Sequence, residues 1–189
     1  MLDDLVRKNR SYRKFDQNEP VPADLLTAMV ESARVCPSSR NQQALKFWII
    51  DREEKCLKIF PLLSWAGFIK DWDGPEMGER PSAYILILGD KKLGQKFATD
   101  TGICAQTVLL KAVSQGYGGC MIASINRIKL QEMFKIPEDF EIILMLALGK
   151  PVEKVVIEEA ADGDIKYWRD EHDIHHVPKR SVEDLLVDF

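Results

Sequence analysis

The chain has 189 residues, of which 46% are apolar and 30% charged, with a formal net charge of −4 at pH 7. This length suits one domain, so we expect residues 1–189 to form a single domain whose core folds without disulfides or metals. The acidic balance gives no reason to expect binding to nucleic acid or to an anionic membrane. No apolar run approaches the ~20 residues that cross a bilayer, and the N-terminus lacks a signal-peptide region. We therefore expect a cytoplasmic protein.

The first third of the chain predicts two helices and a strand. Residues 2–9 predict a short helix, and residues 19–35 predict a longer one in which apolar side chains recur at i, i+3, i+4 and i+7. Pro37 disfavours continuation of that helix. Residues 45–51 predict a strand in which Leu45, Phe47 and Ile49 lie on one face.

The middle third predicts a helix, a long loop and a buried strand. Residues 53–63 are helical in pattern as far as Pro61, and residues 64–81 place two tryptophans among glycines and prolines. Such a loop either covers a site or packs its tryptophans on the core, and the sequence leaves both interpretations open. Residues 83–90 form a continuous apolar run, which is typical of a central strand buried on both faces.

The last part of the chain predicts a core helix at residues 100–116, because this segment is apolar almost all round. A short helix near residues 128–134 and a buried strand at 141–151 follow. We expect residues 164–189 to be irregular and then briefly helical. Together these elements predict an α+β fold in which helices flank a central mixed β-sheet.

The usual signatures of catalytic side chains are missing. The chain has no GxGxxG after a strand, no phosphate-binding GxxxxGK[ST] and no GxSxG nucleophile elbow. The four cysteines are scattered without a CxxC pair, so we expect reduced and mostly buried thiols. His172, His175 and His176 could supply two metal ligands, but they lack an HExxH context or a nearby cysteine, and we expect no metal site. If the protein is an enzyme, its reactive group is then a bound cofactor.

Two polar clusters remain. In "NRSYRKF", residues 9–15, two arginines and a serine could bind phosphate, since arginine forms bidentate bonds to it; the alternative is a solvated helix end. In "CPSSRNQQA", residues 36–44, hydroxyls and amides precede a strand. Amides both donate and accept, which suits the edge of a heterocycle; the alternative is a turn that ends a helix.

In this order, the two clusters resemble the short form of the FMN-dependent nitroreductase family. That family carries a pattern like RRSxRxF after its first helix and PSxxNxQPW farther along. Residues 100–122 also resemble its central helix and turn, "ALGKP" at 147–151 its late strand end, and "HVPKRSVEDLL" at 176–186 the ending of some members. Asn9, Thr107 and Ala44-Leu45 depart from the family pattern, and Asn9 puts part of the phosphate site in doubt.

The resemblance implies a nitroreductase-like fold completed by homodimerisation, with FMN as cofactor and NADH or NADPH as reductant. It implies that the FMN phosphate is held by Arg10, Ser11 and Arg13, with Lys179 or Arg180 closing on it from the tail. The isoalloxazine ring would be met from the partner subunit by Pro37, Ser38, Ser39 and Asn41. Backbone groups of Ile122, Ala123 and Ser124 would face the reactive edge of the ring, and Gly149 and Lys150 would lie near the ribityl chain or phosphate.

The implied activity is reduction of a small electron acceptor, such as a nitroaromatic or a quinone, by ping-pong hydride transfer without a catalytic side chain. Alternatives are flavin storage without turnover, and dehalogenation or flavin breakdown as in relatives on the same fold. We expect the partner subunit to approach the small residues of the helix at 100–116. The sequence does not distinguish the acceptor or the nicotinamide.

Overall fold

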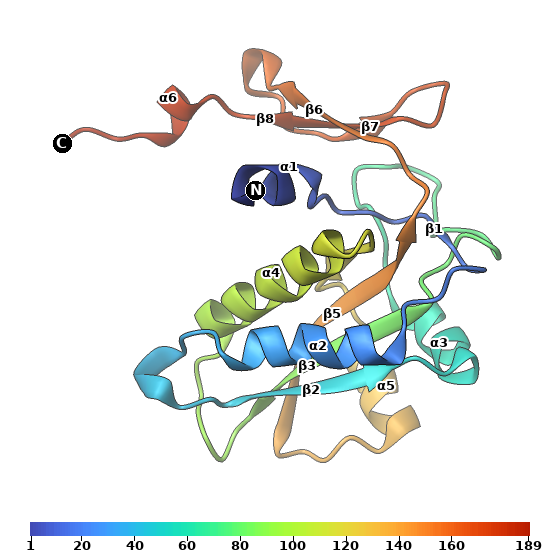
Figure 1. The fold of residues 1–189 in the computed structure, drawn as a ribbon, viewed down its shortest axis with the longest axis vertical. Coiled ribbons are helices and arrows are strands. Elements are labelled where there is room, and N and C mark those ends of the chain that lie inside the picture. The colour runs from blue at the N-terminus through green and yellow to red at the C-terminus, as the bar shows by residue number, and fades with distance from the viewer.

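The long apolar runs form the middle of a five-stranded β-sheet in the computed structural model, which describes residues 1–189 (Figure 1). Its strands are β1 (Phe15–Asp16), β2 (Leu45–Ile50), β3 (Ala83–Asp90), β4 (Gly118–Ile122) and β5 (Phe140–Pro151). The strand order is β1-β5-β3-β2, and β4 also pairs with β5. The long strand β5 therefore pairs along one edge with β4 and then, at its C-terminal end, with the short β1. The predicted strands at 45–51, 83–90 and 141–151 are confirmed.

The α+β class is confirmed. All named strand pairs of this sheet are antiparallel, and its parallel pairing is limited to an isolated bridge between Ser11 and Gly119 of β4. The parallel strand pair of the molecule, β6 with β8, lies in a separate small sheet. Apolar runs predict burial on both faces but carry no information on strand direction, which depends on how the connections return.

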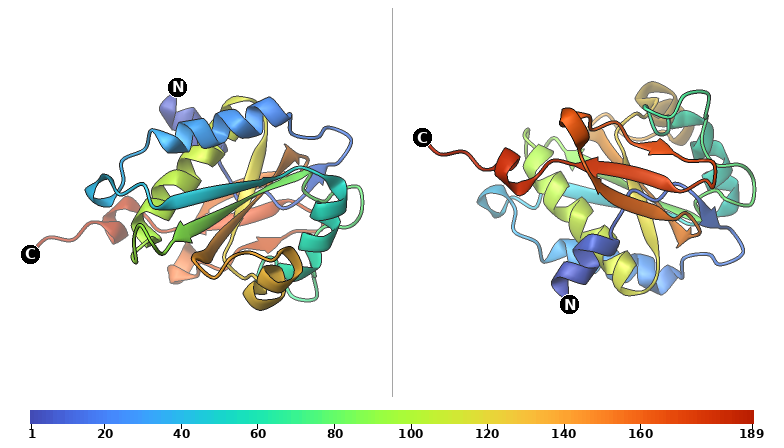
Figure 2. Two further views of the ribbon diagram at one scale, coloured as in Figure 1. Left: turned by 90° about the horizontal axis from the view of Figure 1, so that it is seen from below. Right: turned by 90° about the horizontal axis from the view of Figure 1, so that it is seen from above.

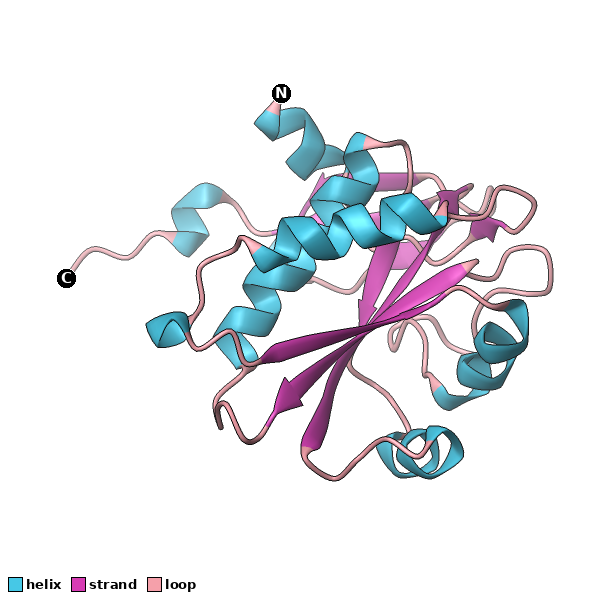
Figure 3. Cartoon of the chain, turned by 60° about the horizontal axis from the view of Figure 1, so that its bottom comes forward, coloured by secondary structure: helices cyan, strands magenta, loops and turns pink.

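Helices cover both faces of the main sheet (Figure 3). α2 (Ala23–Arg34) and α4 (Ala98–Ser114) cover one face, while α3 (Glu53–Ile59) and α5 (Arg127–Phe134) lie on the other. Side chains of β3 alternate between the two resulting cores: Ile85 and Ile87 enter one, Tyr84 and Leu86 the other. A strand that serves two cores must be apolar throughout, which is why residues 83–90 lack the alternation of a half-exposed strand.

The small residues of α4 serve the chain's own core. Ala105 and Ala112 are fully buried in the cluster between α4, α2 and the sheet, whereas Gly102 faces open space. The prediction that this small-residue face is free for a partner is therefore wrong for both alanines. The helix is amphipathic rather than apolar all round.

The loop at residues 64–81 packs its tryptophans inward. Trp65 is 6% exposed and contacts the ring of Phe60 at 5.6 Å, and Trp72 lies 6.5 Å from Trp65. The second of the two sequence interpretations thus holds for these rings, although residues at the start of the loop also border a cavity.

The C-terminal segment forms a second sheet, which corrects the expected irregular tail. Its strands are β6 (Val155–Glu159), β7 (Trp168–Arg169) and β8 (His175–Lys179), in the order β6-β8-β7. This sheet lies at the end of the molecule that carries α1 (Leu2–Lys8) (Figures 1 and 2). After the short α6 (Val182–Leu185) the chain projects away from the body. No helix has both the length and the hydropathy needed to cross a membrane.

Candidate functional site

A cavity of about 170 Å³ brings two of the predicted clusters together. Arg13 from the first polar cluster borders it, and so do Ile122, Ala123 and Ser124 at the end of β4. The remaining walls come from residues 64–67, Cys120, Met121 and Tyr167. The sequence offered no reason to place residues 64–67 or Tyr167 here.

Close backbone contact holds the first cluster against β4. The Tyr12 amide donates to the Gly119 carbonyl at 3.1 Å, and a Cβ at Gly119 would overlap the Ala147 carbonyl. Glycine is required at this position because neighbouring backbone on either side, at Tyr12 and at Ala147, leaves no room for a side chain. Asn9, which departs from the family pattern, is 9% exposed and donates to Gln106 of α4 at 3.2 Å. It anchors the segment on α4.

Arg13 is buried without a carboxylate for its guanidinium. The residue is 8% exposed, its Nη1 donates to the Ser11 carbonyl at 3.1 Å, and the Tyr167 ring lies 5.0 Å from its guanidinium carbon. Glu153 is close, but it accepts from the Arg13 backbone amide at 2.8 Å and from Arg169 Nη2 at 2.6 Å. The carboxylate is thus committed to Arg169, and no acidic side chain forms an ion pair with Arg13.

His175 stands between these charges as a neutral base. It is 1% exposed, with Nε2 3.4 Å from Arg13 Nη1 and Nδ1 3.7 Å from Glu153 Oε1. Burial lowers the pKa of His175 to about 4, with help from Arg13 and Arg169 and against the effect of Glu153. A neutral ring with its proton on Nδ1 can accept a hydrogen bond from Arg13 Nη1 at Nε2.

The other two histidines point elsewhere. His176 stacks on Trp168 at 4.1 Å and contacts Glu158 at 2.5 Å and Asp170 at 3.3 Å, and these carboxylates raise its pKa. His172 is exposed beside Glu171. Because consecutive residues of a strand face opposite sides, His175 and His176 cannot share a ligand.

The rest of the first cluster surrounds Arg13 less tightly. Arg10 donates from Nη2 to the Val6 carbonyl at 2.8 Å, and its buried Nε has no partner. Ser11 is exposed, and its hydroxyl lies near the Cys120 thiol, whose pKa is raised by burial. A thiol with a raised pKa stays protonated at neutral pH, so Cys120 is a wall of the cavity rather than a nucleophile.

Only Arg13, Ile122, Ala123 and Ser124 of the fourteen predicted residues line this cavity; the other ten, Arg10 and Ser11 among them, do not. Lys179 and Arg180 are exposed at the end of β8, where their side chains form no ion pair or hydrogen bond within the chain. Gly149 packs under the Phe15 ring, and Lys150 pairs with Glu19 at 3.4 Å. Gly149 and Lys150 are therefore engaged within the chain.

The second cluster lies at the opposite end of the main sheet from β1 (Figure 1). Its 3₁₀ turn, η1 (Ser39–Asn41), is exposed, and the Ser39 amide donates to Asp100 Oδ1 at 3.0 Å. Arg40, Asn41 and Gln43 all have positive φ values of 50–55°. Left-handed conformations at non-glycine residues are strained and occur at functional sites. One chain does not bring Pro37, Ser38, Ser39 and Asn41 to Arg13.

Arg13 suits the phosphate end of FMN, because its buried guanidinium borders the cavity and has no carboxylate partner. The cavity itself is smaller than the roughly 300–1,000 Å³ of pockets that enclose a drug-sized ligand. A ligand of the size of FMN would need further walls beyond those of this cavity.

Comparison with known proteins identifies the family. The model of the nitroreductase family matches residues 6–150. A putative NAD(P)H nitroreductase of Bacillus subtilis, YodC, is 23% identical over 180 residues, covering 79% of this chain and 89% of the relative.

Two solved structures share the fold. A nitroreductase family protein from Streptococcus pneumoniae superposes with a TM-score of 0.70 at 18% identity, over 85% of this chain and 96% of the other. A putative nitroreductase from Exiguobacterium sibiricum in complex with FMN gives 0.68 at 21% identity, over 81% and 89%. The chain belongs to the nitroreductase family.

Proposed function

We propose that the protein is an FMN-dependent NAD(P)H oxidoreductase that reduces small acceptors such as nitroaromatics or quinones. The observation that carries the proposal is the buried guanidinium of Arg13, which faces a cavity and has no carboxylate partner. The similarity to a structure that contains FMN, and to a relative described as an NAD(P)H nitroreductase, supports the choice of cofactor and reductant.

An unpaired buried charge costs several kcal/mol unless something compensates it. Glu153 is near enough to neutralise Arg13, but its carboxylate forms an ion pair with Arg169 instead. A phosphate dianion in the cavity would supply the missing charge and accept two N–H bonds from one guanidinium. Arg10 and Ser11 would add donors, and Lys179 or Arg180 would approach from the tail of the same chain or of a partner.

FMN, when bound, supplies hydride transfer between the nicotinamide and the acceptor. The chain's own residues would bind FMN and orient it. Backbone groups at Ile122, Ala123 and Ser124 border the cavity and would face the ring. No side chain there is suited to move a proton at neutral pH, since the Cys120 pKa is raised and the His175 pKa is about 4.

A second copy of the chain would complete the site. The C-terminal arm, residues 181–189, is exposed along its whole length, and Leu185, Leu186 and Val187 are 67–73% exposed. Apolar side chains on a projecting arm are stabilised when they pack on another surface. In a homodimer, Pro37, Ser38, Ser39 and Asn41 of one subunit would meet the flavin held by Arg13 of the other.

The visible spectrum of the purified protein tests the cofactor. We expect about one FMN per chain and FMN binding at least ~100-fold tighter than riboflavin binding, because hydrogen bonds to charged groups contribute about 1.5–3 kcal/mol each. Ser11→Ala should weaken FMN binding several-fold, whereas Ser114→Ala, at an exposed residue that does not line the cavity, should not. Equal affinity for FMN and riboflavin would refute the phosphate site.

Turnover separates an enzyme from a flavin-storage protein. NADH or NADPH should be oxidised with ping-pong kinetics when a quinone is the acceptor, and a chain shortened after Arg180 should sediment as a monomer. A bound flavin that no nicotinamide reduces would favour storage. A shortened chain that remains dimeric would show that the arm does not hold the subunits together.

A further inference from the structure

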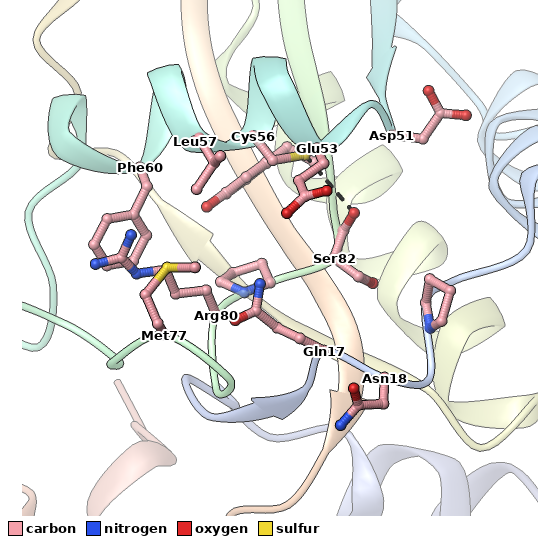
Figure 4. A pocket seen from close by; sticks show the side chains of 13 residues that line it. Gln17, Asn18, Asp51, Glu53, Cys56, Leu57, Phe60, Met77, Arg80 and Ser82 are labelled. Carbon is pink, nitrogen blue, oxygen red and sulfur yellow. Dashed lines mark hydrogen bonds between the residues drawn. The ribbon is translucent and has the colours of Figure 1, made fainter.

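A second and larger cavity, of about 450 Å³, lies away from the site at Arg13 (Figure 4). It is enclosed by the connection between β1 and α2, by α3, and by residues 77–82 with Tyr84 of β3. It shares no lining residue with the cavity beside Arg13. Its volume falls in the roughly 300–1,000 Å³ range of small-molecule sites.

Arg80 presents free donors at one end of this cavity. Its guanidinium lies over the Phe60 ring at 3.9 Å, and Nε donates to the Pro75 carbonyl at 3.3 Å. No carboxylate pairs with it, and Figure 4 shows it stacked beside Phe60. A guanidinium held flat on a ring, with its terminal N–H groups free, is preorganised to bind a planar oxyanion through two bonds.

Tyr84 adds a hydroxyl that has no hydrogen-bond partner within the chain. The residue is 1% exposed and lines the cavity. Burial and the nearby Cys56 raise the pKa of Tyr84, while Arg80 opposes the rise, so the hydroxyl stays protonated at neutral pH. A hydroxyl that opens on a cavity can donate to a ligand, and a ligand oxygen on Arg80 would accept its hydrogen bond.

Carboxylates stand at the other end. Asp51 and Glu53 line the cavity and form no ion pair within the chain. Burial, with Asp51 and Glu53, raises the pKa of the Cys56 thiol to about 11. Figure 4 shows Asp51 on the opposite side of the cavity from Arg80, with Glu53 between them in this view. The polar groups along the wall thus run from negative to positive.

Apolar side chains form much of the remaining wall. Leu57, Met77, Pro20 and Pro81 line the cavity. Two carboxylates against one guanidinium disfavour a simple anion, and the guanidinium disfavours a simple cation, because like charges repel across a short distance. The lining therefore favours a molecule that carries both charges on an apolar body.

We propose that this cavity binds a small zwitterion, with its carboxylate on Arg80 and Tyr84, its ammonium group at Asp51 and Glu53, and its apolar body over Phe60 and Leu57. This site does not depend on bound flavin, so the proposal can be tested separately from the proposed oxidoreductase activity.

Three matched probes test the charge requirement: 4-(aminomethyl)benzoate, 4-methylbenzoate and 4-methylbenzylamine. Binding to the intact protein is followed by calorimetry and by NMR shifts of the Arg80 and Tyr84 signals. The zwitterion should bind about tenfold or more tightly than either singly charged probe, since each end adds a charge-assisted hydrogen bond.

Tyr84→Phe removes the hydroxyl without breaking a hydrogen bond of the protein, so this variant should fold normally. It should weaken binding of the zwitterion about tenfold and leave binding of the amine unchanged. Arg80→Gln should abolish the preference for the carboxylate, and Glu53→Gln should weaken the two amine-bearing probes. Glu54→Gln, the neighbouring residue outside the cavity, is the matched control.

Equal binding of the three probes, or unchanged affinity for the zwitterion in Tyr84→Phe, would overturn the proposal. So would the absence of any shift at Arg80 and Tyr84 with all three probes. Flavin content and flavin reduction by NAD(P)H should be the same in every variant, which distinguishes a failure of this site from a failure of the proposed function.

Discussion

The two β-sheets of this protein are stabilised in different ways. The five-stranded sheet lies between two apolar clusters, and β3 is buried from Ala83 to Gly89. The three-stranded sheet is joined to the body by buried charges, chiefly Glu153 with Arg169 and with the backbone of Arg13. Apolar burial is non-directional and tolerates adjustment, whereas a buried charge is stable only with its own partners. The small sheet should therefore be the more sensitive of the two to single polar changes.

The contact between the two regions also lies at the candidate site. Tyr167 of the tail packs on Phe68 at 5.0 Å and borders the cavity beside Arg13, and Arg169 lies over Trp72 at 4.3 Å. The family match ends at residue 150, before the small sheet begins. The part of the site that lies beyond the family match is thus supplied by the segment whose attachment depends on charge.

The largest effect is expected from Glu153→Ala. This change leaves Arg169 and the Arg13 amide without their partner, and breaking a buried pair in this way costs about 3–5 kcal/mol. We expect hydrogen exchange at residues 155–179 to become fast while the main sheet stays protected. Glu159→Ala, an exposed position on β6, is the control and should change the unfolding free energy by less than about 0.5 kcal/mol. Uniform loss of protection over both sheets would show that they unfold as one unit.

Leu146→Ala tests the other side of the comparison. Leu146 is fully buried in the cluster beneath α2 and α4, and such a truncation costs about 2–5 kcal/mol through lost burial and the cavity left behind. Denaturant unfolding at fixed protein concentration should show the loss, with both sheets affected together. Leu93→Ala, on an exposed turn, should have little effect. A loss confined to the small sheet would contradict the assignment of the main core.

Acid should weaken the attachment of the small sheet through His175. Its folded-state pKa of about 4 lies below its ordinary value of 6.5. The unfolded chain therefore takes up the proton first. The stabilisation is complete above pH 6.5 and is lost as the pH falls toward 4. It amounts to about 2–3 kcal/mol between pH 7 and pH 4.5.

The unfolding free energy of His175→Gln should accordingly fall less between these two pH values than that of the unaltered protein. NMR titration provides the internal control, because the His176 pKa is raised by its carboxylate partners. His176 contributes stability below its ordinary pKa and loses it as the pH rises. If both histidines titrate together near pH 6.5, the buried position of His175 is wrong.

The smallest effect is expected at the rim of the same contact. Lys14 pairs with Asp173 at 2.6 Å, and the Asp173 side chain is 55% exposed. Surface pairs contribute about 0–1 kcal/mol and weaken with salt. Asp173→Asn suits this test, because Asp173 has φ near 59° and asparagine tolerates that conformation. We expect a small loss of stability in urea at low salt and none at high salt; a loss of several kcal/mol would place the pair among the buried charges.

The sequence by itself determined the apolar framework and the first polar cluster. Continuous runs such as residues 83–90 and the helical spacing of Leu26, Met29 and Ala33 follow from burial, and burial leaves a periodic record along the chain. The first polar cluster was also recognisable, because its residue types and order resemble one family, and the phosphate role of Arg10, Ser11 and Arg13 stays a prediction. These patterns involve residues that are close in the sequence, so they can be recognised without the structure.

Only the tertiary structure decided the partners of the charges. Glu153, Arg169 and His175 lie 140 or more residues from Arg13, and nothing in their local sequence indicates that they meet it. Strand direction, the small sheet and the inward side of α4 were likewise decided by long-range packing. A buried polar contact forms only when two residues far apart in the sequence meet in space. A single sequence shows both residues but does not show that they meet.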